Sequence, residues 1–242
     1  MTPNSDSVGS WRKGAHYNMN KRKLQIGTYD TAEDGRWTLA AWRLGRAEAV
    51  ESYATVPGRS GPLDLSTVLT DGEPYYGPRS FEATLECSEG TRLEREQVIN
   101  QMINALDGFR LDIVLPDDPD HYITGRVRVE RLYNDLAHAS VHVTATCDPW
   151  RYNASETVVV LNAATTEQTA MLSNSGRLSV VPKVEILNAD VTLRFGADAE
   201  ERSWALSPGD YLLGEIYLKT GSWPLRYSGA GQVRLTYREA VL

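Results

Sequence analysis

The chain has 242 residues, of which 41% are hydrophobic and 24% charged, so it can bury a core without disulfides or metals. Its formal net charge of -7 disfavours specific nucleic-acid binding. No apolar run approaches the about 20 residues that cross a bilayer, so we expect no membrane insertion.

The first 23 residues are polar and contain two basic groups, Trp11-Arg12-Lys13 and Lys21-Arg22-Lys23. They lack the apolar segment of a signal peptide. Together with the presence of only two cysteines, Cys87 and Cys147, this predicts folding in a reducing cytosol. A basic arm of this kind could touch DNA, but a solvated tail is the more common role of such a segment.

The middle of the chain alternates apolar and polar residues. This period of two predicts strands around 81–87, 111–115, 127–129 and 141–147, with both cysteines buried. From about Arg95 to Asp107 the apolar residues recur at helical spacing instead. Thr91 and Glu94 match a capping box, and Gly108 matches a helix stop. We expect this helix to cover one face of the sheet.

The composition changes at the polar segment 153–157, and a new alternation begins at Val158. It predicts strands around 191–195, 204–206, 216–218, 225–227 and 233–237, with turns at 188–190, 207–210, 220–222 and 228–231. Gly229-Ala230-Gly231 reads as a hairpin turn. Short, regularly spaced strands without a helix predict a β-sandwich. The chain is therefore predicted to be mainly β, with domains at 1–152 and 153–242.

No catalytic, cofactor-binding or metal-binding pattern is present. Asp117, Asp118, Asp120 and His121 are oxygen and imidazole ligands, but the spacing of an EF-hand is absent, and a turn between two strands is favoured. Neither cysteine belongs to a CxxC pair, and Gly58-Arg59-Ser60-Gly61 lacks the spacing of a nucleophile elbow. We therefore expect no enzymatic activity, no cofactor and no metal.

Four segments carry a resemblance to a known family: Val56–Leu65, Leu115–Tyr122, Gly125–Val129 and Ala145–Tyr152. In this order they resemble the N-terminal domain of phage distal tail (Dit) proteins. The resemblance implies a β-rich, ring-forming domain with one helix, followed by a galectin-like β-sandwich. Residues 206–239 look like the last strands of such a sandwich. The family supplies no catalytic residues. The long polar segment before residue 24 departs from the family pattern.

This resemblance implies a structural virion protein at the tail tip, assembled in the host cytoplasm. It would form a homohexameric ring that joins the tail tube protein to the tail-tip hub or baseplate. The alternative is a carbohydrate-binding module that contacts host surface glycans, and a receptor-binding protein is a further candidate partner. Six aromatic residues of the second half could stack on sugars, although most are expected in the core: Trp204, Tyr211, Tyr217, Trp223, Tyr227 and Tyr237.

The segment Pro116–His121 is the candidate subunit interface. It is expected to form a stiff, acidic loop, longer than the two-residue turn of a tight hairpin. We expect its carboxylates to meet basic residues of a neighbouring subunit, either Lys21–Lys23 or the arginines of the following strand. The candidate interface residues are Asp117, Asp118, Asp120, Arg126, Arg128 and Arg131.

Overall fold

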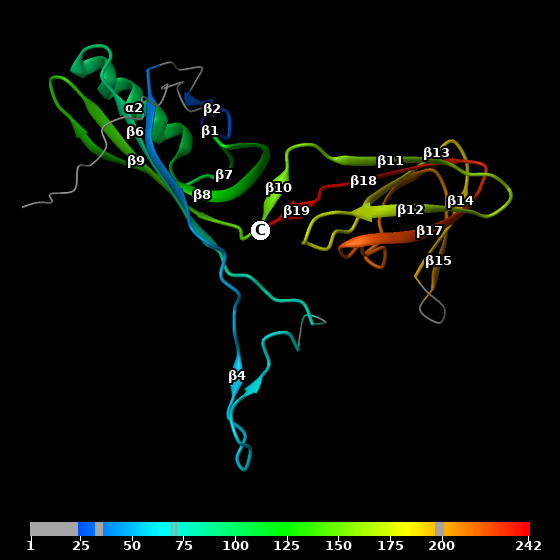
Figure 1. Cartoon of the computed structure of the whole chain (residues 1–242). Helices are drawn as coiled ribbons and strands as arrows, with labels where there is room; N and C mark the ends of the chain where they lie inside the picture. Colours follow the sequence, from blue (N-terminus) through cyan, green and yellow to red (C-terminus); the bar gives the residue numbers. More distant parts are fainter. Residues whose placement is uncertain (1–23, 32–35, 69, 71, 197–200) are drawn as a thin grey trace, which may run out of the picture.

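The structure is a computed structural model that describes residues 24–31, 36–68, 70, 72–196 and 201–242 (Figure 1). The basic segment 1–23, predicted to be a solvated tail, lies outside the described residues. The described chain consists mainly of antiparallel strands, which confirms the predicted fold class. It forms a large sheet carrying a helix, a β-sandwich, and an arm that projects away from both (Figure 1).

The large sheet has the strand order β2-β1-β7-β8-β9-β6-β3. The bounds of these strands are β1 Gln25–Ile26, β2 Tyr29–Asp30, β3 Thr38–Leu44, β6 Arg79–Cys87, β7 Arg110–Leu115, β8 Asp118–Asn134 and β9 Ala139–Cys147. The predicted strands at 81–87, 111–115 and 141–147 are present. The predicted strand at 127–129 is the middle of the much longer β8.

Helix α2, Arg92–Leu106, covers β8 and β9. The predicted capping box is present: the Glu94 backbone N–H donates to Thr91 Oγ1 at 3.3 Å, and the Thr91 N–H donates to Glu94 Oε2 at 2.7 Å. Gly108, with φ of +80°, follows the C-cap and ends the helix as predicted. No helix in the described part of the chain is both long and apolar enough to cross a membrane.

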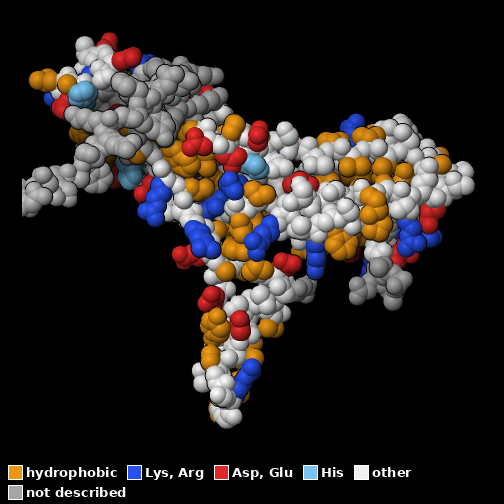
Figure 2. Space-filling model, in the orientation of Figure 1, with side chains coloured by type: hydrophobic (Ala, Val, Ile, Leu, Met, Phe, Trp, Pro, Cys, Tyr) orange, Lys and Arg blue, Asp and Glu red, His pale blue; other side chains and the backbone are white. Residues whose placement is uncertain are grey.

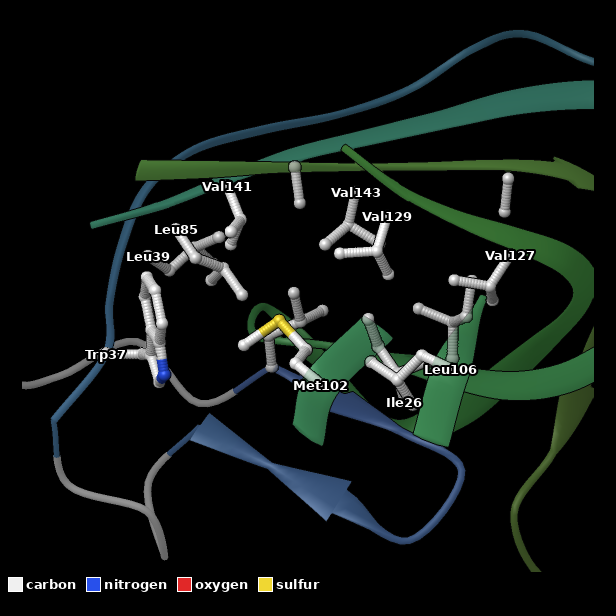
Figure 3. Close-up of a cluster of buried hydrophobic side chains, with 14 of the residues drawn as sticks. Ile26, Trp37, Leu39, Leu85, Met102, Leu106, Val127, Val129, Val141 and Val143 are labelled. Carbon is white, nitrogen blue, oxygen red and sulfur yellow. The ribbon is translucent and has the colours of Figure 1, made fainter. Parts of the chain in front are cut away.

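The first hydrophobic core lies between the helix and the sheet. Figure 3 shows Met102 and Leu106 of the helix pointing toward Val127, Val129 and the valines of β9. Cys87 and Cys147 are both buried in this core, as predicted. They lie at opposite ends of the β6–β9 ladder, where Cys147 faces Arg79 and Cys87 faces Ala139. At about 3.4 Å per residue, this eight-residue offset separates them by about 27 Å, too far for a disulfide.

The second half is a sandwich of two four-stranded sheets, with orders β11-β18-β13-β16 and β12-β17-β14-β15. The strand bounds are β11 Thr157–Asn162, β12 Gln168–Asn174, β13 Lys183–Leu187, β14 Val191–Phe195, β15 Arg202–Leu206, β16 Gly209–Leu212, β17 Gly221–Gly229 and β18 Gln232–Tyr237. Their inward-facing residues form a second core that shares no residue with the first.

The predicted hairpin at 228–231 is not a hairpin. Strands β17 and β18, on either side of it, belong to different sheets, so the chain here crosses the sandwich. The glycines permit a close approach to the turn at 188–190, because a Cβ on Gly231 would lie 2.0 Å from the Ala189 carbonyl oxygen. Period-two alternation shows which residues face inward but not which sheet they join.

Three further predictions in the sandwich were wrong. No strand forms at 216–218: Ile216 and Leu218 are buried in the core, but Leu218 makes only an isolated bridge with Val180. Because Ile216 and Leu218 are buried and Tyr217 is exposed, this segment has the apolar–polar alternation of a strand without the ladder of backbone hydrogen bonds of one. Conversely, β16 begins at Gly209, inside the predicted turn 207–210, and β17 begins at Gly221, inside the predicted turn 220–222.

Candidate functional site

The most unusual feature is an arm formed by residues 45–78, between β3 and β6, which projects from the body (Figure 1). Near its far end, β4 (Tyr53–Ala54) pairs with β5 (Leu63–Asp64). Near its base, Ala49 forms a bridge with Tyr76. The segment Val56–Leu65, on which part of the family resemblance rests, contains the turn between β4 and β5.

The arm has no core of its own. None of its described residues from 48 to 78 is buried. Large hydrophobic side chains nevertheless occur along it, and Figure 2 shows them on its surface. They are Val50, Tyr53, Val56, Val68 and Tyr75, which are 41% to 64% exposed. An element that exposes several large apolar side chains and has no core of its own is suited to contact with a partner.

The acidic segment Pro116–His121 differs from its prediction. Leu115 pairs with Asp118, so the turn contains only Pro116 and Asp117, and β8 already begins at Asp118. The expected longer loop is absent because residues 118–121 are held in strand β8, where β10 pairs with His121 and Tyr122.

Asp118 has partners within its own chain. Its Oδ1 lies 2.6 Å from His121 Nδ1, and its Oδ2 accepts a hydrogen bond from Arg151 Nη1 at 2.7 Å. Arg151 in turn donates from Nη2 to the Leu242 carbonyl oxygen at 2.5 Å. The Asp118 carboxylate therefore stabilises the region where the two halves meet.

The remaining candidate interface residues are exposed. Asp117 and Asp120 carry no side-chain hydrogen bond or ion pair within the described residues, and the same is true of Arg128. Arg126 donates to the Gly108 carbonyl at 2.7 Å. Arg131 lies on the other face of the strand and forms an ion pair of 2.6 Å with Glu96 of the helix. The role of these residues between subunits stays a prediction.

Strand β10, Arg151–Asn153, joins the two halves. It pairs with β8 of the large sheet and with β19, Ala240–Val241, at the end of the chain. The rings of Tyr122 and Tyr152 stack across the β8–β10 pair with centroids 5.7 Å apart. The Arg238 guanidinium lies over the Tyr122 ring and donates 2.6 Å hydrogen bonds to the carbonyls of Asn153 and Ala154. A boundary at residue 152/153 stays a prediction, since these contacts cross it.

The described residues contain no group of three or more His, Cys, Asp or Glu side chains that could hold a metal ion. Burial raises the pKa of the Cys147 thiol to about 11, and the nearby Arg79 only partly opposes this. A thiol with such a pKa stays protonated at neutral pH and is a poor nucleophile.

The aromatic residues of the second half are mostly in the core, as expected. Tyr237 is buried, and Trp204, Tyr211, Trp223 and Tyr227 pack against the same cluster. Tyr217 is the exception, with 43% of its surface exposed.

Comparisons with known proteins place the fold. The chain aligns with the crystal structure of SPP1 Dit (gp 19.1), with a TM-score of 0.63 over 89% of this chain and 98% of that one, at 14% sequence identity. The chain has the fold of a phage Dit protein. The match extends well beyond the first 152 residues, so it includes part of the sandwich. No protein-family model and no curated protein sequence matches the chain.

Sequence reasoning missed the arm as a projecting element and missed the contacts at β10. A signal for the arm was present: residues 45–78 show neither helical nor strand periodicity, although they contain several large hydrophobic residues. The partners of Asp118 gave no signal, because Arg151 is 33 residues away along the chain.

Proposed function

We propose that this protein is a structural component of a phage tail tip, where copies of it form a ring. The proposal rests on the shared fold with SPP1 Dit, a protein described as a paradigm of the hub adsorption apparatus in phages that infect Gram-positive bacteria. A hub needs a rigid scaffold with surfaces for several neighbours, and a β-rich body with an outstretched arm suits that role.

The arm is the observation that favours self-association. Its hydrophobic side chains, among them Tyr53 and Val56, are not buried by the described part of the chain, and exposing them to water is unfavourable. An arm that docks on the body of the next copy makes a head-to-tail contact. Such contacts generate a closed ring when the rotation between copies closes.

We further propose six copies per ring, as the Dit resemblance implies, with the tail tube protein on one side and the hub or baseplate on the other. The protein would then be located at the tail tip of the virion, after assembly in the host cytoplasm. The sandwich would be of the galectin-like kind. The role would be structural, without catalysis, which agrees with the lack of a catalytic spacing in the sequence.

Electron microscopy of assembled tails tests the ring. Class averages at this protein's position should show six-fold symmetry. Three-fold symmetry, or none, would contradict the proposal. The protein alone can stay monomeric without its neighbours, so the test uses whole tails.

Substitutions in the arm test its role in the contact. Tyr53→Asp and Val56→Asp replace exposed residues, so the monomer should keep its melting temperature while ring assembly is lost. Val158→Asp is the matched control, because Val158 is 52% exposed on the sandwich. If the arm variants assemble as well as this control, the arm does not hold the ring together.

Carbohydrate binding is a second candidate function. It is favoured by one observation, a pocket lined by aromatic side chains at the junction of the arm, the sheet and the sandwich.

A further inference from the structure

A pocket of about 540 Å³ lies where the base of the arm, the segment after β9 and two loops of the sandwich meet. Figure 1 shows that these parts of the chain converge near β10 and β19. We call it the junction pocket, and its lining residues include Glu73, Tyr75, Tyr76, Trp150, Arg177 and Tyr217.

Several aromatic rings line the walls. Tyr76 and Trp150 meet edge to face with centroids 5.5 Å apart, which fixes two rings next to each other. Tyr75 and Tyr217 are 61% and 43% exposed and belong to the arm and the sandwich respectively. Together with Tyr152, these make five aromatic side chains that line one open space.

The pocket is also lined by an arginine, Arg177, whose guanidinium is not engaged in a hydrogen bond or ion pair with any described residue. The Arg177 guanidinium lies over the Tyr76 ring, 5.5 Å from its centroid, which orients it. Its side chain makes no hydrogen bond or ion pair to any described residue, so all five of its N–H donors are available. The Glu73 carboxylate is likewise unpaired within the described part of the chain, which places an acceptor on the same rim.

This combination suits a saccharide. A pyranose ring has an apolar C–H face that stacks on an aromatic side chain, and a rim of hydroxyl groups that need both donors and acceptors. A purely apolar ligand would make no hydrogen bond with Arg177 or Glu73. A polyphosphate or nucleic acid would be repelled by Glu73 and by the overall charge of -7.

We propose that the junction pocket binds a saccharide, with a sugar face on Tyr217 or Tyr75 and hydroxyl groups on Arg177 and Glu73. The proposal rests on the second candidate function, carbohydrate binding, and gives it a site; it does not depend on the ring role. It also moves the sugar site from the sandwich alone to the junction, because five of the six aromatic residues considered in the sequence belong to the second core.

The test is a binding screen of the full chain. The probes are a panel of bacterial surface polysaccharide fragments and simple di- to tetrasaccharides, with glycerol-phosphate oligomers as a phosphate-bearing arm. Binding is followed by the fluorescence of tryptophan, which includes Trp150 in the pocket wall, and is quantified by calorimetry. At least one saccharide is expected to bind in the millimolar range or tighter, while the glycerol-phosphate oligomers do not.

Variants of exposed residues then locate the site. Tyr217→Ala and Arg177→Ala should each weaken saccharide binding by about tenfold, equivalent to about 1.4 kcal/mol, with unchanged melting temperatures. Tyr133→Ala is the matched control, since Tyr133 is 44% exposed at the far end of β8. Equal binding by all three variants would overturn the proposal.

Two further outcomes would also overturn it. One is that no saccharide of the panel binds at millimolar concentration. The other is that Tyr217→Ala and Arg177→Ala leave saccharide binding intact but abolish the ring seen in tails, which would make the pocket a subunit contact. The proposed ring role can fail without affecting this result, because the binding screen uses the chain outside the tail.

Discussion

Gly125 and Cys147 face each other across β8 and β9, and a Cβ built on Gly125 would lie 2.5 Å from the Cys147 sulfur. Cys147 also faces Arg79 on β6, so these three residues form one row across the sheet at the edge of the first core. The row is tightly packed, and only a glycine fits beside the thiol.

We expect Gly125→Ala to lower the free energy of unfolding by about 1–3 kcal/mol, because the added methyl group overpacks the row. Cys147→Ala in the same chain should recover part of the loss by removing the sulfur. Denaturant unfolding of the four members of this double-mutant cycle measures the coupling. Strictly additive effects would show that the sulfur is not what excludes the methyl group.

The buried thiol predicts a dependence of stability on alkaline pH. The pKa of Cys147 is about 11 in the folded chain, above its ordinary value of 9.0. The folded state therefore favours the protonated thiol, and its stabilisation is complete below pH 9.0 and is lost as the pH rises toward 11. The loss amounts to about 2–3 kcal/mol at most.

Cys147→Ala is the control for this effect. Urea unfolding under reducing conditions, below pH 9.0 and near pH 11, should show a smaller decrease in the variant than in the parent. The comparison matters because tyrosines also titrate in this range. Identical decreases would mean that the thiolate is tolerated in the core.

Two buried arginines are expected to behave in opposite ways. Arg95 is 2% exposed, and its guanidinium donates to the carbonyls of Gly90 and Asp135 at 2.6 and 2.8 Å. Arg79 is 7% exposed, but its Nε and Nη2 find no partner among the described residues. Burial, and then the nearby Arg151, lower the pKa of Arg79. A buried charge without a partner destabilises the fold.

Arg79→Met should therefore raise the free energy of unfolding by about 1 kcal/mol or more. Arg95→Met should lower it by about 2–4 kcal/mol, because it leaves carbonyls unsatisfied. Thermal and denaturant unfolding of both variants checks the contrast. A clear destabilisation by Arg79→Met would show that the Arg79 guanidinium has a favourable partner.

Sequence reasoning succeeded where the determinants are local. The helix at 92–106 follows from apolar spacing and from the Thr91–Glu94 capping box, and both depend on residues within a few positions of each other. It failed where the partner is distant. The assignment of β17 and β18 to different sheets, and the pairing of Asp118 with Arg151, depend on how the whole chain packs. The arm was not predicted because none of its described residues from 48 to 78 is buried, so its sequence shows no periodic alternation of apolar and polar residues.

The contacts of Arg238 with the segment 153–157 allow a test of whether the domains 1–152 and 153–242 fold independently. Its guanidinium bonds the carbonyls of Asn153 and Ala154 at 2.6 Å each and pairs with Glu156 at 3.1 Å. We expect Arg238→Ala to free this segment and to accelerate limited proteolysis there, giving two resistant fragments. The control is Arg234→Ala, which breaks a 3.0 Å pair with Glu185 on the sandwich surface.

Mass spectrometry of the fragments locates the cuts. If Arg238→Ala is cleaved no faster than Arg234→Ala, then other contacts, such as the β10–β19 pairing, hold the junction. A single resistant core that spans the segment in every variant would argue against separable domains at 1–152 and 153–242.

The aspartates of the segment Pro116–His121 are expected to have two different roles, one within the chain and one between subunits. Asp118 pairs with His121 and Arg151, so Asp118→Asn should lower the free energy of unfolding by about 1 kcal/mol. Asp117 and Asp120 are exposed and unpaired in the described chain, so their double replacement by Asn should leave the melting temperature nearly unchanged.

If these two carboxylates meet basic residues of a neighbouring subunit, the same double variant should weaken ring assembly. Exposed ion pairs contribute about 0–1 kcal/mol each, so the effect should be modest and should be largest at low salt, where screening is weakest. Ring assembly, scored by electron microscopy of tails across a salt series, is the measurement. Assembly equal to that of the parent at every salt concentration would mean that Asp117 and Asp120 are solvated residues of a tight turn, and that only Asp118 has a structural role.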